Sequence, residues 1–116
     1  MAHYEHLPIY RKAMDVAFYF EKIVKNFSRY NKYTLGAELR ILSKDIVKLI
    51  IRVNSSKEKL PLLHELRERL EELKIVIRIA KEVHAFKNFQ SFQHAIEEVV
   101  SVSKQNEGWI KSLSVK

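Results

Sequence analysis

Apolar residues recur at steps of three and four along most of the chain, the spacing that places side chains on one face of an α-helix. The clearest stripe lies between Pro61 and Val83 and consists of Leu63, Leu66, Leu70, Leu73, Ile77 and Ala80. Pro61 suits the first position of a helix, because its missing N–H would have no intrahelical partner there. Comparable stripes elsewhere predict an all-α protein with helices at residues 8–27, 35–54, 61–85 and 89–113.

Short polar connectors separate these four segments, so consecutive helices should run in opposite directions. We therefore predict an antiparallel up-down-up-down four-helix bundle that forms a single domain over residues 1–116. The first six residues are expected to be an irregular lead-in. Thr34 and Asn88 are the expected N-caps. Gly36 should permit close packing, and Gly108 should weaken or end the last helix locally.

The second half of the 61–85 helix carries more apolar residues than a bundle needs. From Lys74 to Ala80, apolar side chains occur on nearly every side of the helix. A helix in a small bundle buries one stripe, and here that stripe already includes Ile77 and Ala80. The surplus residues are Ile75, Val76 and Ile79. They should contact either something beyond their own chain or a very wide interface within it. We predict the first, an interface between copies of the chain.

Positive charge is concentrated in one third of the chain. The net charge is +7, and residues 22–57 contain nine basic residues against two acidic ones, Glu38 and Asp45. This stretch therefore carries as much net charge as the whole chain. Such a block favours an anionic partner, although a merely soluble basic protein would show it too.

Two sets of basic residues define a candidate nucleic-acid interface. Arg40, Lys44, Lys48 and Arg52 follow one another at an unbroken spacing of four on the 35–54 helix, and Arg67, Lys74, Arg78 and Lys81 lie on the next helix. We predict that these eight residues form a basic band that binds nucleic acid. The alternative for the 35–54 helix is a solvated face whose charge is partly neutralised by Asp45 and by acidic residues of a neighbouring helix. Tyr30 and Tyr33 lie beside it and could either stack on bases or pack the end of the bundle.

The sequence offers little support for catalysis or a cofactor. There is no cysteine, and the two glycines are far apart, so a thiolate nucleophile and a Gly-rich phosphate loop are excluded. His64-Glu65 begins like a zinc-binding H-E-x-x-H motif, but position 68 is Glu. We therefore predict a protein that is not an enzyme and has no metal and no cofactor. The absence of cysteine, of a signal-peptide pattern and of a long apolar run favours a cytoplasmic protein without a membrane partner.

Four segments of the chain together carry a family resemblance. They are Leu7–Tyr10 (LPIY), Tyr33–Arg40 (YTLGAELR), Leu60–Leu63 (LPLL) and Gly108–Ile110 (GWI). The pattern resembles Avd, the accessory variability determinant of diversity-generating retroelements. That family belongs with the four-helix-bundle proteins encoded in ribosomal-RNA intervening sequences. The resemblance extends from Leu7 to Leu113.

The resemblance implies a homopentamer of four-helix bundles with a positively charged surface. It also implies binding to the reverse transcriptase of the retroelement and to RNA or DNA, namely the template RNA and its cDNA. In that role the protein supports mutagenic reverse transcription and makes no bonds itself. The alternative is an interaction scaffold of the intervening-sequence type that has no retroelement role.

Overall fold

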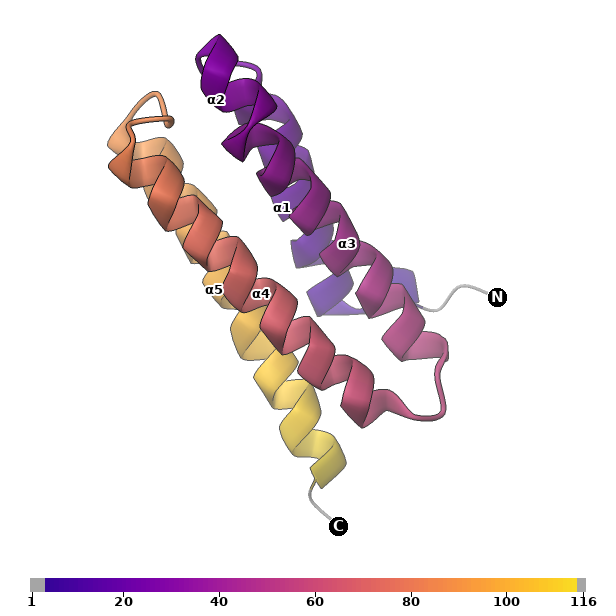
Figure 1. Cartoon of the computed structure of the whole chain (residues 1–116). Helices are drawn as coiled ribbons and strands as arrows, with labels where there is room; N and C mark the ends of the chain where they lie inside the picture. Colours follow the sequence, from indigo (N-terminus) through magenta and orange to yellow (C-terminus); the bar gives the residue numbers. More distant parts are fainter. Residues whose placement is uncertain (1–3, 115–116) are drawn as a thin grey trace.

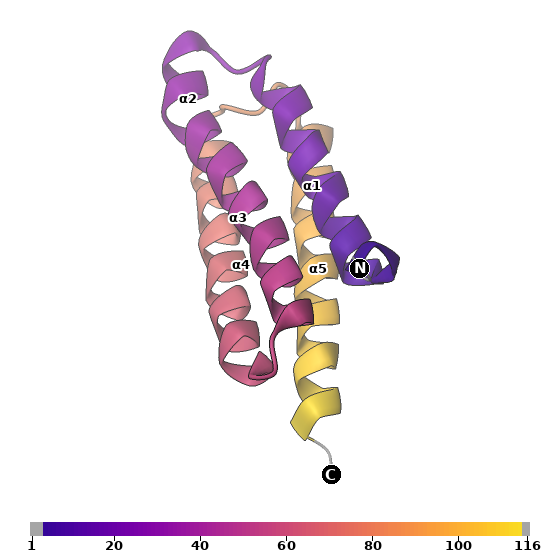
Figure 2. The same ribbon diagram turned by 90° about the vertical axis from the view of Figure 1, so that its right-hand side faces the viewer.

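A computed structural model describes residues 4–114 and shows an all-α protein (Figure 1). The elements in chain order are the 3-10 helix η1 (Tyr4–His6) and the α-helices α1 (Pro8–Val24), α2 (Arg29–Tyr33), α3 (Leu35–Ser55), α4 (Lys59–Glu82) and α5 (Phe89–Ser114). The four long helices pack into a compact bundle, as predicted, with consecutive long helices running in opposite directions (Figures 1 and 2). Helix α3 packs against α1 and α4, and α5 packs against the same two helices. The long helices thus form a ring around one core.

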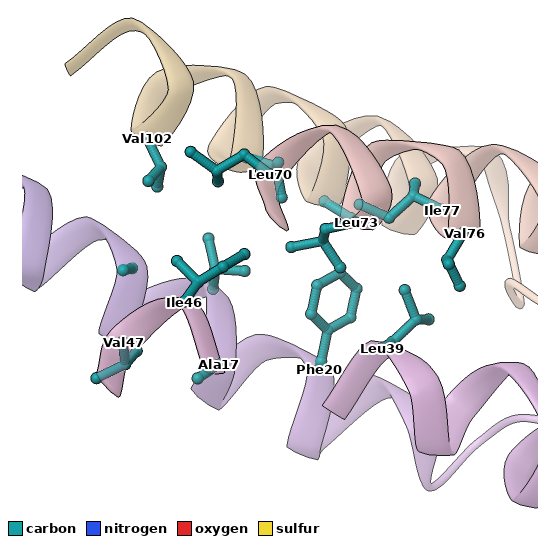
Figure 3. Packing of buried hydrophobic residues seen from close by; sticks show 14 of the residues in the cluster. Ala17, Phe20, Leu39, Ile46, Val47, Leu70, Leu73, Val76, Ile77 and Val102 are labelled. Carbon is teal, nitrogen blue, oxygen red and sulfur yellow. The ribbon is translucent and has the colours of Figure 1, made fainter. Parts of the chain in front are cut away.

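The predicted apolar stripe of α4 is at the centre of that core. All six of its residues, from Leu63 to Ala80, expose 1% or less of their surface. Phe20 from α1, Leu39 from α3 and Val102 from α5 are equally buried, and Figure 3 shows the core side chains converging between the helices. Full burial of one such Leu, Ile or Phe side chain contributes roughly 1.5–3 kcal/mol relative to exposure. The four stripes therefore supply the main stabilisation of the bundle.

Helix α1 ends a turn earlier than the sequence pattern predicts. It ends at Val24, and the amides of Asn26 and Phe27 donate to carbonyls three residues earlier. The tighter turn still buries Phe27 in the core. The connector that follows contains the short helix α2, because the Ser28 hydroxyl accepts a hydrogen bond from the Asn31 amide and caps its N-terminus. The polar connector expected here therefore contains a short helix that the sequence pattern did not predict.

The start of the chain also contains an element that the sequence pattern did not predict. Residues 4–6 of the expected irregular lead-in form η1, and the rings of Tyr4 and Tyr10 meet edge to face, 4.9 Å apart. Residues 1–3 of that lead-in lie outside the described residues. This ring contact holds η1 against the first turns of α1.

Helix α4 ends at Glu82, three residues before the predicted end. The amide of His84 donates to the Lys81 carbonyl, and the amide of Ala85 donates to the Ala80 carbonyl. This pair of bonds is a Schellman motif, which requires a left-handed residue just after the helix. His84 adopts it, with φ of 60°. Helix α4 begins at Lys59, two residues before the predicted start, so Pro61 occupies its third position and not its first. Its missing N–H still costs no intrahelical bond, because it lies in the first turn.

One of the two predicted N-caps acts as expected. The side-chain oxygen of Asn88 accepts a hydrogen bond of 2.8 Å from the Ser91 amide at the start of α5. Thr34 does precede α3, but its hydroxyl donates to the Tyr30 carbonyl at 2.9 Å and caps nothing. The Thr34 hydroxyl therefore ties α2 to the beginning of α3.

The two glycines have opposite environments. A Cβ placed on Gly36 would lie 2.5 Å from a Val24 methyl group and 3.2 Å from the Asn31 carbonyl, which confirms the close approach predicted there. A Cβ on Gly108 would meet nothing within 4 Å. Helix α5 continues through Gly108 to Ser114, so the expected weakening did not interrupt it.

These environments make Gly36→Ala and Gly108→Ala a matched pair. Overpacking of a dense core costs about 1–3 kcal/mol, while replacing a helical glycine by alanine gains up to about 1 kcal/mol. We expect Gly36→Ala to lower the free energy of unfolding by about 1–2 kcal/mol, and Gly108→Ala to raise it by up to about 1 kcal/mol. Urea denaturation followed by circular dichroism measures both. Equal stability of the two variants would contradict the close approach at Gly36.

Candidate protein and nucleic-acid binding surfaces

Apolar side chains that do not enter the core gather on the outer side of α3 and α4. Ile75 and Ile79 lie one turn apart on α4 and expose 56% and 46% of their surface, and Ile41 on α3 exposes 59%. Between the two helices lies an open groove of about 440 Å³. We call this region the α3/α4 surface; it consists of Glu38, Ile41, Leu42, Glu72, Ile75, Val76 and Ile79.

The structure separates the three residues that the sequence assigned to a self-interface. Ile75 and Ile79 lie on the outside of the bundle, whereas Val76 is buried and points from α4 toward Leu39 of α3 (Figure 3). Val76 also forms part of the groove wall. It therefore supports the α3/α4 surface from beneath, and the exposed area comes from the two isoleucines and Ile41.

A second apolar surface lies on the other side of α3, against α1. Phe18 exposes 62% of its surface and adjoins a groove of about 260 Å³. We call it the Phe18 surface; it consists of Met14, Ala17, Phe18, Glu21, Lys44, Val47 and Lys48. The hydrophobic pattern of the sequence did not predict this surface, because a single aromatic residue outside the stripe gives no periodic signal. The available signal was that Phe18 is large and lies off the apolar stripe of α1.

The basic residues of α3 do not share one direction. A step of four residues turns 40° around a helix, so the direction changes by about 120° from Arg40 to Arg52. Lys44 and Lys48 line the Phe18 groove next to α1. The ammonium group of Lys44 lies 3.0 Å from a carboxylate oxygen of Glu21. Within residues 4–114, Arg40, Lys48 and Arg52 form no ion pair.

Most of the basic residues of α4 are paired inside the chain. Arg67 donates two hydrogen bonds to the Glu107 carboxylate, at 2.7 and 2.6 Å. Lys74 donates to Glu71 at 2.9 Å. Lys81 lies 3.8 Å from a Glu82 oxygen and 5.2 Å from the centre of the Phe92 ring of α5. Of the four predicted α4 cations, Arg78 lacks an ion pair with any residue in the described range 4–114.

The two basic sets lie on different sides of the molecule. Arg67 and Lys74 line a pocket of about 310 Å³ between α4 and α5, while Lys44 and Lys48 lie between α3 and α1. The α3/α4 surface separates these two regions, because its groove lies between the two helices that carry the cations. The structure therefore does not bring the eight predicted residues into one continuous band.

The Arg67–Glu107 pair is a close, half-exposed ion pair that links α4 to α5. The hydrogen bonds from Arg67 lower the pKa of the Glu107 carboxyl, and partial desolvation opposes that change. The same bonds raise the pKa of Arg67. Beneath the pair, the buried Asn106 side chain donates to the Leu63 carbonyl at 3.2 Å and ties α5 to α4. The pair joins the same two helices at the surface.

Both loop tyrosines are exposed. Tyr30 and Tyr33 expose 77% and 68% of their surface at the end of the bundle where α2 lies. The interpretation that they pack the bundle end was therefore wrong. Their rings are free to contact a partner.

The described residues contain neither a group of side chains suited to a metal ion nor a helix suited to span a membrane. Between residues 4 and 114, no three His, Cys, Asp or Glu side chains are grouped so that they could hold a metal ion. No helix in that range has the length and apolarity that a membrane span requires.

Comparison with known proteins identifies a family. A family model described as bAvd-like matches residues 7–113, which include nearly all of the four long helices. No curated protein matches the chain.

The Glu107 pKa provides a test of the ion pair. A carboxyl whose pKa is lowered by folding stabilises the protein above its unfolded pKa, and this contribution is lost as the pH falls through the folded pKa. We expect Arg67→Gln to raise the pKa of Glu107, measured by NMR of its side-chain carboxyl carbon. Arg67→Lys should give an intermediate value, because it keeps the charge without the two-pronged geometry. An unchanged pKa in Arg67→Gln would contradict the pairing.

Proposed function

The chain belongs to the bAvd-like family, the bacterial Avd proteins of diversity-generating retroelements, and from this premise we propose that it binds the reverse transcriptase and the nucleic acid of such an element. Membership implies an accessory protein, and the family consists of non-catalytic members. The match over residues 7–113 carries the proposal. In this role the protein supports mutagenic reverse transcription of template RNA into cDNA.

The charge distribution supports the nucleic-acid part of the proposal. The net charge is +7, and four of the eight predicted contact residues form no ion pair within residues 4–114. These are Arg40, Lys48, Arg52 and Arg78. Within a single copy, these four charges can reach phosphates without breaking an existing pair. By contrast, Lys44, Arg67, Lys74 and Lys81 would exchange a carboxylate for a phosphate. The exposed Tyr30 and Tyr33 could add base stacking.

The exposed isoleucines support assembly of several copies, for which we propose the homopentamer that the family resemblance implies. Ile41, Ile75 and Ile79 form a continuous apolar surface, and a monomer would leave it in water. At about 25 cal/mol per Å² of apolar area, covering these side chains favours association. Ile75, Val76 and Ile79 remain the residues that we place at this contact, with Val76 acting from beneath.

RNA affinity at several salt concentrations tests the cation assignment. Each lost phosphate contact flattens the slope of log affinity against log salt by roughly 0.7–0.9. We expect the triple variant Arg40→Gln, Arg52→Gln, Arg78→Gln to flatten the slope for structured RNA by about 2–3. The matched control, Arg67→Gln, Lys74→Gln, Lys81→Gln, removes equal charge from paired residues and should change the slope less. A plain polyanion bound as tightly as RNA and single-stranded DNA would contradict nucleic-acid recognition.

Co-elution with a reverse transcriptase tests the retroelement role. The purified chain should elute at a multiple of its single-chain mass, measured by light scattering. It should shift to a larger complex when the reverse transcriptase of a diversity-generating retroelement is added. Separate elution of the two proteins would favour the alternative, an interaction scaffold of the intervening-sequence type. The internal pairing of four predicted cations is the observation that favours that alternative.

A further inference from the structure

Helix α3 is flanked by two apolar surfaces of different shape. On the α1 side, the Phe18 ring stands out from the bundle with 62% of its surface exposed. On the α4 side, Ile41 and Ile75 line an open groove of about 440 Å³. A groove of this volume has room for an aromatic ring. One surface therefore offers a protruding ring, and the other offers a place for it.

The charged residues around the two surfaces have opposite signs. Lys44 and Lys48 border the Phe18 surface, where Glu21 is drawn to Lys44 at 3.0 Å. Glu38 and Glu72 border the α3/α4 surface. Glu72 lies 3.4 Å from Arg69. Within residues 4–114, Lys48 and Glu38 form no ion pair, so each surface keeps one unpaired charge of its own sign.

Pairing either surface with itself would be unfavourable. Two α3/α4 surfaces in contact would bring Glu38 and Glu72 toward the same carboxylates of the other copy and would leave Phe18 in water. Two Phe18 surfaces would bring lysines together and leave the isoleucines exposed. Contact between unlike surfaces covers both apolar regions and sets positive charge against negative charge.

From these observations we propose that the Phe18 surface of one copy docks on the α3/α4 surface of the next copy. Phe18 packs against Ile41 and Ile75, and Lys48 faces Glu38. This inference rests on the assembly proposed above and names the two surfaces that form it. Because each copy carries both surfaces on opposite sides of α3, the contact repeats head to tail and either closes into a ring or continues as a filament.

The first test uses one disruptive variant for each surface. In Phe18→Glu the new carboxylate would face the acidic residues of the next copy's α3/α4 surface, and in Ile75→Lys the new ammonium group would face the basic residues of its Phe18 surface. Both native side chains are exposed enough to be replaced without disturbing the core. We expect each variant to be a helical monomer by circular dichroism and light scattering. Their equimolar mixture should associate again and elute above the mass of one chain, since Phe18→Glu keeps an intact α3/α4 surface and Ile75→Lys keeps an intact Phe18 surface. Phe89→Glu is the control, because Phe89 is 60% exposed on α5, away from both surfaces, and should leave the assembly intact.

Crosslinking keeps the inference testable if a single contact is too weak to hold a dimer in dilute solution. The chain has no native cysteine, so Phe18→Cys and Ile75→Cys introduce unique thiols. With a short thiol-reactive crosslinker, a mixture of these two variants should give covalent dimers. Neither variant by itself should give them, and neither should a mixture of Phe18→Cys with Phe89→Cys.

The outcomes separate this inference from the proposed function. An assembled wild type in which Phe18→Glu stays assembled, or in which Ile75→Cys crosslinks to itself, would overturn the pairing of unlike surfaces and leave the assembly standing. Failure of the Phe18→Cys and Ile75→Cys mixture to crosslink within an assembled protein would overturn the pairing in the same way. A wild type with the mass of one chain would overturn the proposed assembly itself, and the pairing with it.

Discussion

Burial of one apolar stripe per helix in a closed ring is the constraint on which the rest of the structure depends. Each long helix packs against two neighbours, so its stripe is covered by both and by the shared core. Any apolar side chain outside that arc has no partner within the bundle. Phe18, Ile41, Ile75 and Ile79 are therefore exposed because the ring is already complete without them. The same closure fixes the two grooves on either side of α3.

The sequence was sufficient to predict the four long helices, because 3.6-residue periodicity over 17 or more residues is a strong signal. It was less reliable at the helix ends, where a few hydrogen bonds decide. The apolar pattern continues past Glu82, yet a Schellman motif with His84 in the left-handed region stops α4 there. Likewise, Ser28 nucleates α2 through one capping bond, which periodicity does not register.

The candidate sites were harder to predict, because they depend on neighbours that a single helix does not reveal. Ile75 and Val76 are adjacent and equally apolar, but one step of 100° turns Val76 toward α3 and leaves Ile75 outside. The positive charges were counted correctly, but their partners come from other helices or other turns. Glu107 lies 40 positions beyond Arg67, and Glu21 lies on α1 opposite Lys44. Charge counted along the chain therefore overstates the charge that is free to bind a ligand.

The drift of the α3 cations around their helix connects assembly with nucleic-acid binding. Exposed ion pairs contribute little to stability, so cations such as Lys44 can exchange partners at small cost. A docked copy would draw Lys44 and Lys48 into the contact between chains, because both residues line the Phe18 groove. Arg40, Arg52 and Arg78 line none of the three grooves described here, so their charge stays available to phosphates in an assembly. The 40° turn between successive α3 cations would thus divide these cations between two partners, a neighbouring copy and a nucleic acid. If all four α3 cations pointed in one direction, the neighbouring copy and the nucleic acid would compete for the same side chains.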